Sequence, residues 1–508
     1  MKHLICIVFG IGVMLAQSHA AGFEVKTSSI ISQPALEVLG EHNGSWYAIG
    51  LEKPGNLNKP PRYKIMKYAA GFSNGTSSEL YPSFGEKTHY LQAAIINNKI
   101  SLFYGRCELR VDESAMMNTQ EGRAVMPVIE RQDFDLNTLQ PAGSAVVIFD
   151  QKDDYFAASG IEIVQNADKS KTAVLIKPYY KYQKYKVVFT DNQSGTETSH
   201  TYSFKDLKEY LSFVNAGINN NGQMYVVAKV RTDIPGTPQS KNGDKYHLFS
   251  LNKNSKEPAK ADFTPSGESG KPVSPLKTAV LGNGELVIAF DRFSDAAGTA
   301  YEGLSVVKFN EALSVTGQRD IQPSEKLVPL AEQYNKFKKG REFSNVELQQ
   351  VFPLEGSNFM LLTEYHARTP NTGKDAPVTV ERSFMITYRM DEALNVRKQN
   401  FIHKKQKSAV VDYAFSAQAY RKGNDVYLFY NDDWESDDAA NMNLKCSYLP
   451  ENGESSIKKV LNTSGSFFTS MAQVFMGENN RILFREDRLV DFGDITKEVK
   501  LLEVTINE

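Results

Sequence analysis

The sequence predicts an all-β fold: a single β-propeller of four-stranded antiparallel blades. Two observations lead to this prediction. A unit of turn and strand occurs eight times along the chain, and the last unit lacks one strand that the N-terminal segment can supply. Eight units predict eight blades, with seven as the alternative if one hairpin has been miscounted.

Each unit contains an inner hairpin, in which a turn rich in Asn, Gly or Asp precedes a strongly apolar strand. Asn and Gly suit such turns because tight hairpin loops need positive φ. Examples are "NNNGQMYVVAKV" at 219–230 and "GNGELVIAFDR" at 282–292. The eight turns begin near residues 42, 97, 166, 219, 282, 355, 422 and 477, with a mean spacing of about 62 residues.

A second, more amphipathic hairpin follows each inner one, as at 246–263 and 304–321. Its alternation of polar and apolar residues is typical of half-exposed strands, so each unit supplies four strands. An array of separate small sandwiches is the alternative. Units of about 60 residues without disulfides, however, are too small to be stable alone.

The two ends of the chain predict how the ring closes. The last unit has its inner hairpin and one outer strand, "VKLLEVTINE" at 499–508. The missing strand is available in "FEVKTSSII" at 23–31, so we expect the N-terminal strand to complete the last blade. Such closure removes two open sheet edges.

The N-terminus predicts export. Residues 1–20 combine the basic Lys2, an apolar run at 4–15 and a small-residue site at 18–20. That order is typical of a cleaved signal peptide, and the apolar run is too short to span a bilayer. We therefore expect a signal peptide at 1–20 and a propeller domain at 21–508, in a protein that is periplasmic, held at the cell surface or secreted. No later segment is apolar enough to span a membrane.

Composition narrows the range of partners. With 58 basic and 60 acidic residues the chain is near neutral, so we expect no nucleic-acid partner. Cys107 and Cys446 lie in units that are not neighbours, which argues against a disulfide between them. The histidines lack metal-ligand spacing, and the sequence therefore predicts no metal site and no cofactor.

At the level of fold, the mature chain resembles exported bacterial β-propellers. The Gly-His and Trp-Asp marks of WD repeats, the double glycine of kelch repeats and the Asp boxes of sialidases are all missing. Eight-bladed quinoprotein dehydrogenases use a tryptophan in almost every blade, whereas this chain has only Trp46 and Trp434. The resemblance therefore implies no catalytic residues.

The missing catalytic motifs favour a non-catalytic binding or scaffolding propeller whose partner is an unknown polar ligand, a glycan or a protein. In a propeller, the turns inside hairpins lie on one face, here named the short-turn face. The connections between hairpins and between blades lie on the other, the long-loop face. These connections are long, charged and aromatic, so we expect the ligand on the long-loop face.

Candidate ligand-binding residues end or follow the second strand of each unit. The charged ones are basic in units two to four, and in units five to eight they are carboxylates with three arginines among them. The full set is Arg106, Lys177, Tyr179, Arg231, Asp291, Arg292, Glu364, His366, Arg368, Asp432, Asp433, Trp434, Arg485, Glu486 and Asp487. This segregation predicts a rim that is positive on one side and acidic on the other, which could orient a polar ligand.

The alternative function is a glycan-active hydrolase or lyase that uses paired carboxylates on the same face. Glycosidases place two carboxyl groups roughly 5–9.5 Å apart, one of them a protonated acid. The candidates for such a pair are Asp291, Glu364, Asp432, Asp433, Glu486 and Asp487.

Overall fold

The structure is a computed structural model. It describes residues 22–32, 36–53, 62–72, 75–80, 88–110, 123–150, 158–178, 184–204, 207, 209, 211–231, 244–265, 275–293, 301–322, 345–370, 378–408, 417–432, 443–462, 467–489 and 495–507. The predicted signal peptide lies outside these residues, as do Tyr179, Asp433 and Trp434 of the candidate site.

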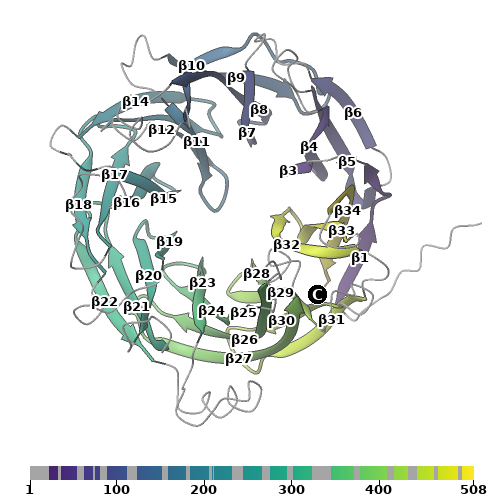
Figure 1. The fold of residues 1–508 in the computed structure, drawn as a ribbon, viewed down its shortest axis with the longest axis vertical. Helices are drawn as coiled ribbons and strands as arrows, with labels where there is room; N and C mark the ends of the chain where they lie inside the picture. Colours follow the sequence, from purple (N-terminus) through teal and green to yellow (C-terminus); the bar gives the residue numbers. More distant parts are fainter. Residues whose placement is uncertain are drawn as a thin grey trace, which may run out of the picture.

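The described residues form eight four-stranded antiparallel blades arranged in a ring, which confirms the predicted fold (Figure 1). From the centre outward, the first four blades are β3 (Leu36–His42), β4 (Ser45–Lys53), β5 (Arg62–Ala69), β6 (Gly75–Leu80); β7 (Thr88–Ile96), β8 (Lys99–Arg110), β9 (Arg123–Asp135), β10 (Val146–Asp150); β11 (Ala158–Gln165), β12 (Lys171–Pro178), β13 (Lys184–Asp191), β14 (Glu197–Ser203); and β15 (Leu211–Ile218), β16 (Gln223–Val230), β17 (Tyr246–Asn252), β18 (Ala259–Phe263).

The next four blades follow the same order. They are β19 (Lys277–Val280), β20 (Leu286–Phe293), β21 (Tyr301–Phe309), β22 (Val315–Ile321); β23 (Val346–Pro353), β24 (Phe359–Tyr365), β26 (Val378–Met390), β27 (Val396–Ser408); β28 (Ala417–Lys422), β29 (Asp425–Asp432), β30 (Asn443–Leu449), β31 (Ser456–Asn462); and β32 (Phe467–Met476), β33 (Arg481–Leu489), β34 (Ile495–Ile506), β1 (Phe23–Thr27). Two short strands, β2 (Ile31–Ser32) and β25 (Ala367–Pro370), add to blades eight and six, and one 3₁₀ turn, η1, spans Ala70–Phe72.

The N-terminal strand closes the ring as predicted. β1 pairs antiparallel with β34 over five residue pairs, from Phe23 opposite Ile506 to Thr27 opposite Leu502. Phe23 is buried, and its ring lies 6.0 Å from that of Phe429 in blade seven. The first strand of the chain thus completes the last blade and also packs on the blade before it.

All eight predicted inner turns form, and in seven of them an Asn or Gly takes the positive φ, whereas in the third it is Lys169, at 57°. Asn97 and Asn98 have φ of 48° and 54°, and Asn479 and Asn480 have φ of 54° and 59°. Such left-handed conformations are costly for most residues. The turn chemistry therefore fixes where each hairpin reverses.

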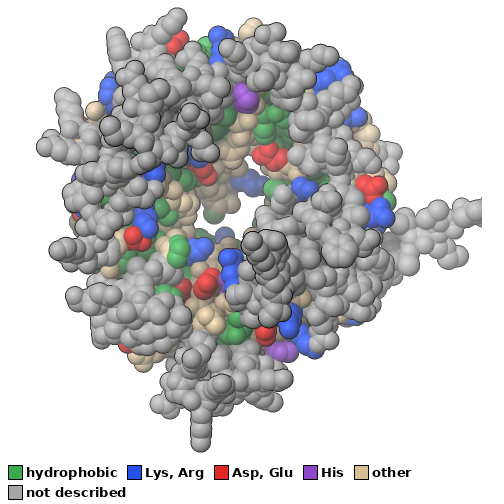
Figure 2. Space-filling model, in the orientation of Figure 1, with side chains coloured by type: hydrophobic (Ala, Val, Ile, Leu, Met, Phe, Trp, Pro, Cys, Tyr) green, Lys and Arg blue, Asp and Glu red, His purple; other side chains and the backbone are tan. Residues whose placement is uncertain are grey.

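The core lies between blades. Side chains alternate along a strand, so each second strand packs one side on the preceding blade and the other on the following blade. In β29, Phe429 packs towards blade eight, while Tyr430 belongs to the cluster shared with blade six. Figure 2 shows the ring from the same side as Figure 1, with an opening along its axis. We use the word junction for the contact between two neighbouring blades.

Three further features bear on function. Within the part of the chain that the structure describes, no helix has the length and apolar character needed to cross a membrane. Cys446 is a free, buried thiol. Among the described side chains, no group of three or more His, Cys, Asp or Glu residues is placed to hold a metal ion.

Candidate functional site

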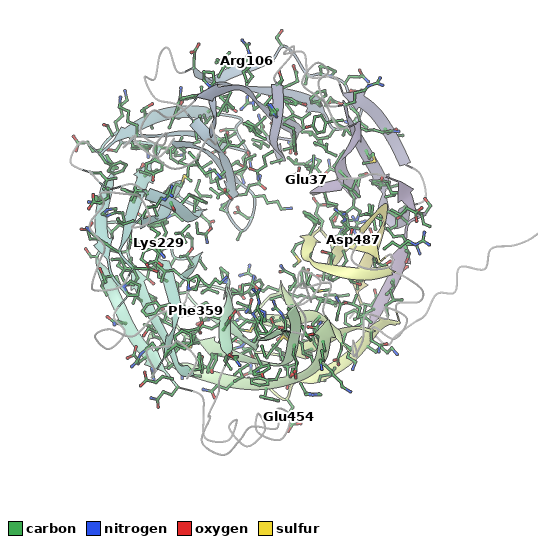
Figure 3. All side chains as sticks on the ribbon, in the orientation of Figure 1. Glu37, Arg106, Lys229, Phe359, Glu454 and Asp487 are labelled. Atoms are coloured by element: carbon green, nitrogen blue, oxygen red, sulfur yellow. The ribbon has the colours of Figure 1, made fainter. Side chains whose placement is uncertain are left out.

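The described candidate residues lie where the second strand of a blade ends, on its long-loop side. Figure 3 marks two of them, Arg106 on blade two and Asp487 on blade eight. They divide into basic residues of blades two to four and charged residues of blades five to eight, and the two groups have different surroundings.

The basic group keeps contact with solvent. The Arg106 side chain is 52% exposed and forms an ion pair of 3.1 Å with Glu130. Lys177 lies 3.2 Å from Glu162, and its ammonium sits 5.1 Å above the ring of Phe213 in blade four. Arg231 directly follows β16 and is half-buried.

In blade five, Asp291 is fully buried and faces blade six. One of its carboxylate oxygens accepts the backbone N–H of Leu348 at 2.8 Å. The next residue, Arg292, points to the other side of the strand and pairs with Glu302 at 3.3 Å and Asp320 at 2.5 Å in its own blade. The two neighbours in sequence are therefore separated by the sheet.

Blades six and seven bring two candidate carboxylates to one junction. Glu364 is buried and pairs with Arg382 and with Lys404. Asp432 accepts the backbone N–H of Lys405 at 2.6 Å and pairs with Lys445 at 2.6 Å. Burial lowers the pKa of Lys404, and both Glu364 and Asp432 oppose that shift. This charged cluster therefore links the two blades.

A histidine lies beside this cluster in blade six. His366 Nδ1 lies 3.1 Å from Glu347, and the exposed Arg368 donates from Nε to His366 Nε2 at 3.3 Å. His366 lowers the pKa of the Glu347 carboxyl, which is the largest effect on that group. The three side chains form a polar row towards the surface.

Blade eight carries its two carboxylates on opposite sides of β33. Arg485 pairs with Asp487 at 2.7 Å and donates to the backbone oxygen of Leu36 in blade one at 3.0 Å. Glu486 points the other way. Burial raises its pKa to about 7, with Lys500 opposing the shift. Burial also raises the pKa of Asp487, and Arg485 opposes that shift.

The five described carboxylates therefore lie inside junctions and not on an exposed acidic rim. Each is at most 5% exposed, because the neighbouring blade covers the end of the second strand: Asp291, Glu364, Asp432, Glu486 and Asp487. Glu364 and Asp432 share a junction, but cations hold both. Glu486 faces blade seven, whereas Asp432 bonds to Lys405 of blade six and to Lys445 in its own blade.

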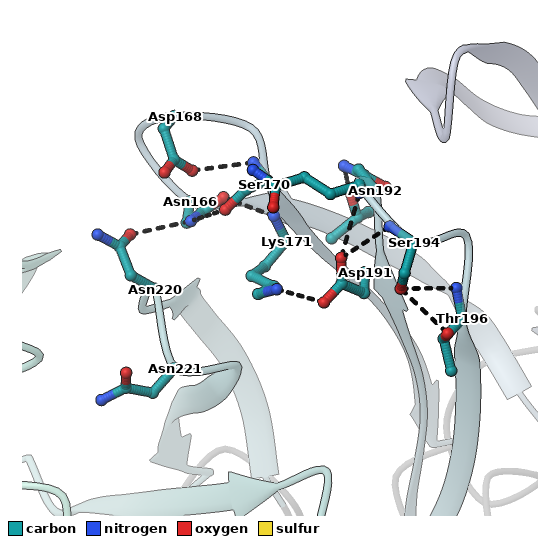
Figure 4. Close-up of polar contacts among 12 residues, drawn as sticks. Asn166, Asp168, Ser170, Lys171, Asp191, Asn192, Ser194, Thr196, Asn220 and Asn221 are labelled. Carbon is teal, nitrogen blue, oxygen red and sulfur yellow. Dashed lines mark hydrogen bonds and ion pairs between the residues drawn. The ribbon is translucent and has the colours of Figure 1, made fainter.

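On the opposite face, a pocket of about 200 Å³ opens between blades three and four (Figure 4). Blade three supplies the start of β12, the end of β13 and the turn into β14. Blade four supplies the end of β15 and two turns. The pocket is lined by Lys171, Thr172, Phe189, Thr190, Asp191, Ser194, Thr196, Thr198, Ile218, Gly222 and Lys253.

Strand pairing explains the arrangement of the pocket walls. Lys171 lies opposite Asp191, and Phe189 lies opposite Thr198. Phe189 belongs to the core cluster that blade three shares with Ile218 of blade four, so these four blade-three side chains face blade four. The two apolar residues form a floor beneath charged and hydroxyl-bearing walls.

Hydrogen bonds hold the rim of the pocket in place. Asn166 of blade three donates to Asn220 of blade four at 2.9 Å (Figure 4). His200 and Tyr202 of blade three contact the backbone oxygens of Lys253 and Asn252, at 2.6 and 2.7 Å. The two blades are therefore linked on both sides of the opening.

The sequence alone does not predict this pocket, because its residues come from turns that look short and unremarkable. One signal was present. The stretch "TDNQSGTETSHT" at 190–201 is rich in hydroxyl groups and occupies an outer hairpin. Nothing in the sequence, however, indicated that it faces Gly222 and Lys253.

No protein-family model matches the chain, and no curated protein matches its sequence. Among solved structures it is similar to the polysaccharide lyase Uly1, at 9% identity and a TM-score of 0.40, over 84% of this chain and 94% of that one. It is also similar to a prolyl endopeptidase, at 10% identity and a TM-score of 0.40, over 89% of this chain and 54% of that one. A third similarity is to the GH93 alpha-L-arabinofuranosidase of Fusarium graminearum, at 9% identity and a TM-score of 0.35, over 67% and 92%. The chain thus spans about half the length of the prolyl endopeptidase. Similarities this remote say nothing about the activity of the chain.

Proposed function

We propose that the protein is an exported, non-catalytic binding or scaffolding propeller. The observation that supports this most directly is the state of the candidate carboxylates. Glu364 is paired with Arg382 and Lys404, and Asp432 with Lys445, inside one junction. Both carboxylates are buried beneath the neighbouring blade, so neither is open to a substrate. Export rests on the predicted signal peptide.

The partner surface in this proposal is the long-loop face. Arg106 of β8 and Arg368 of β25 are exposed on this side of blades two and six. Exposed arginines suit a polar partner with carboxylate or sulfate groups, because the guanidinium offers several donors in a fixed geometry. A polyanionic glycan or an acidic protein fits this surface.

Charge reversal tests the choice of face. The double variant Arg106→Glu, Arg368→Glu should lose binding to acidic glycans on an array, with the greatest loss at low salt. Lys256→Glu is the matched control, because Lys256 is exposed in the β17–β18 turn on the short-turn face. If Lys256→Glu abolished glycan binding and the double variant did not, the long-loop face would not be the partner surface.

One observation favours the alternative, a glycan-active enzyme. Glu486 is the described candidate whose pKa reaches about 7, which suits a general acid. Incubating the protein with polysaccharides and measuring newly formed reducing ends or unsaturated sugars would test it. Turnover that Glu486→Gln abolishes would establish the enzyme, whereas no turnover across the panel would support a binding protein.

A further inference from the structure

The pocket between blades three and four has the chemistry of a site for one small anion. Its charge can be counted from side chains. The Lys171 ammonium pairs with Asp191 and holds the pKa of that carboxyl at about 2, so these two charges cancel. Lys253 is the second cation in the lining, and among the described residues no acidic side chain pairs with it. The pocket therefore carries one net positive charge.

The position of Lys253 is fixed by its surroundings. His200 and Tyr202 bond to the backbone on either side of it, at Lys253 and Asn252. Its aliphatic stem lies over Gly222, where an added Cβ would come within 3.3 Å of Lys253 Cδ. Gly222 also has a φ of 80°, a conformation that glycine adopts readily. Lys253 therefore lines the pocket from a turn that these contacts brace.

Hydroxyl groups and an apolar floor complete the site. Ser194 donates to Thr196 at 3.0 Å, and Thr198 stands opposite Phe189 on the pocket side of the sheet. Hydroxyls can donate or accept, so they match a ligand with several hydroxyl groups of its own. Phe189 and Ile218 beneath them offer an apolar surface for the carbon skeleton of such a ligand.

Size limits the ligand to one small molecule. The volume is about 200 Å³, below the roughly 300–1,000 Å³ of pockets that hold drug-sized ligands. We infer that this pocket binds a single hydroxylated monocarboxylate of the size of a sugar acid, with its carboxylate on Lys253 and its hydroxyls on Ser194, Thr196 and Thr198. The site lies on the face opposite the proposed partner surface and does not depend on it.

Calorimetric titration of the purified protein tests the inference, with D-glucuronate as the probe. We expect one saturable site per chain, with D-glucose and acetate each binding at least tenfold more weakly, because each lacks half of the recognised groups. Lys253→Met should weaken glucuronate binding at least tenfold, since it removes the charge and keeps the stem. Lys256→Met, in the same turn but outside the pocket lining, should leave it unchanged.

Thr198→Val tests the hydroxyl wall with little change of shape. It should weaken glucuronate binding about three- to tenfold and leave the weaker acetate binding unaffected. Several results would overturn the inference: no glucuronate binding, equal binding by the Lys253→Met variant, or tighter binding of inorganic phosphate, which would indicate a dianion site. Equal melting temperatures of the variants and the parent would show that any loss is local.

Discussion

Two junctions differ at the start of the second strand of a blade. One is the closing junction, between blades eight and one, and the other lies between blades three and four. At both junctions this second strand begins with a cation, which is Arg481 in blade eight and Lys171 in blade three. Arg481 is buried between Glu41 and Glu503, and Trp46 Nε1 donates to Glu503 at 2.6 Å. Lys171 instead meets Asp191 at the edge of a pocket.

The difference is one of side-chain bulk. Trp46 fills the closing junction so tightly that a Cβ added at Gly477 would come within 2.7 Å of its ring. At the other junction, threonines and a serine stand where larger side chains would close the space. One architecture thus gives either a sealed contact or an open pocket, depending on a few residues near the short turns.

The largest expected effect comes from opening blade eight, the blade that forms one side of the closing junction. Deleting Phe23–Thr27 removes the strand that pairs with β34 and exposes that edge. We expect loss of cooperative unfolding and aggregation, because open edges recruit other chains. Urea unfolding together with size-exclusion chromatography would measure both. A peptide "FEVKTSSII" added to the truncated protein should partly restore the transition, and a truncated protein that melts like the intact one would contradict this account of closure.

Matched substitutions of the two cations compare the junctions directly. Arg481→Met leaves Glu41 and Glu503 buried without their cation, and should cost about 3–5 kcal/mol of unfolding free energy. Lys171→Met leaves Asp191 beside solvent, at 23% exposure, and should cost about 1 kcal/mol or less. Equal losses in urea unfolding would mean that the two junctions do not differ as described.

On the other side of blade eight, where Glu486 faces blade seven, we expect the unfolding free energy to depend on pH. Burial raises the pKa of Glu486 from 4.5 to about 7. Between these pH values the folded carboxyl keeps its proton while the unfolded one releases it, so stability falls as pH rises, by at most about 3 kcal/mol. Glu486→Gln cannot ionise, and its unfolding free energy should exceed that of the parent above pH 7.

Comparison of the two proteins from pH 4 to pH 8 isolates this residue. The pKa of Asp487 is also raised and contributes a decline in the same direction to both proteins. The difference between them should therefore grow across the interval and level off near pH 7. A constant difference would show that Glu486 titrates normally in the folded state.

Local signals explain what the sequence could predict. Turn residues and apolar strands located every inner hairpin, and the unpaired strand at 23–31 predicted closure. The side of the strand that a residue faces was harder to predict, because a shift of one position reverses it. Asp291 faces blade six, whereas the next residue, Arg292, pairs within its own blade. The partners of Glu364 and Asp291 lie tens of residues away, in strands whose relative placement no local pattern encodes. The pocket depends on the same long-range placement.

The smallest expected effect comes from filling the pocket between blades three and four, so that this junction resembles the closing junction. Thr198 is half-buried on the pocket side of β14, and isoleucine keeps the β-branched shape that suits a strand. Thr198→Ile adds carbon atoms that would rest on Phe189 and Ile218, so it should raise the unfolding free energy by about 0.5–1 kcal/mol. Thr198→Val adds no bulk, and its unfolding free energy should stay within about 0.5 kcal/mol of that of the parent.

Urea unfolding of the three proteins measures both differences, and glucuronate titration of Thr198→Ile should show weaker binding than titration of Thr198→Val. A loss of more than about 1 kcal/mol in Thr198→Ile would indicate overpacking, and hence that the space beside Thr198 is too small to admit a ligand.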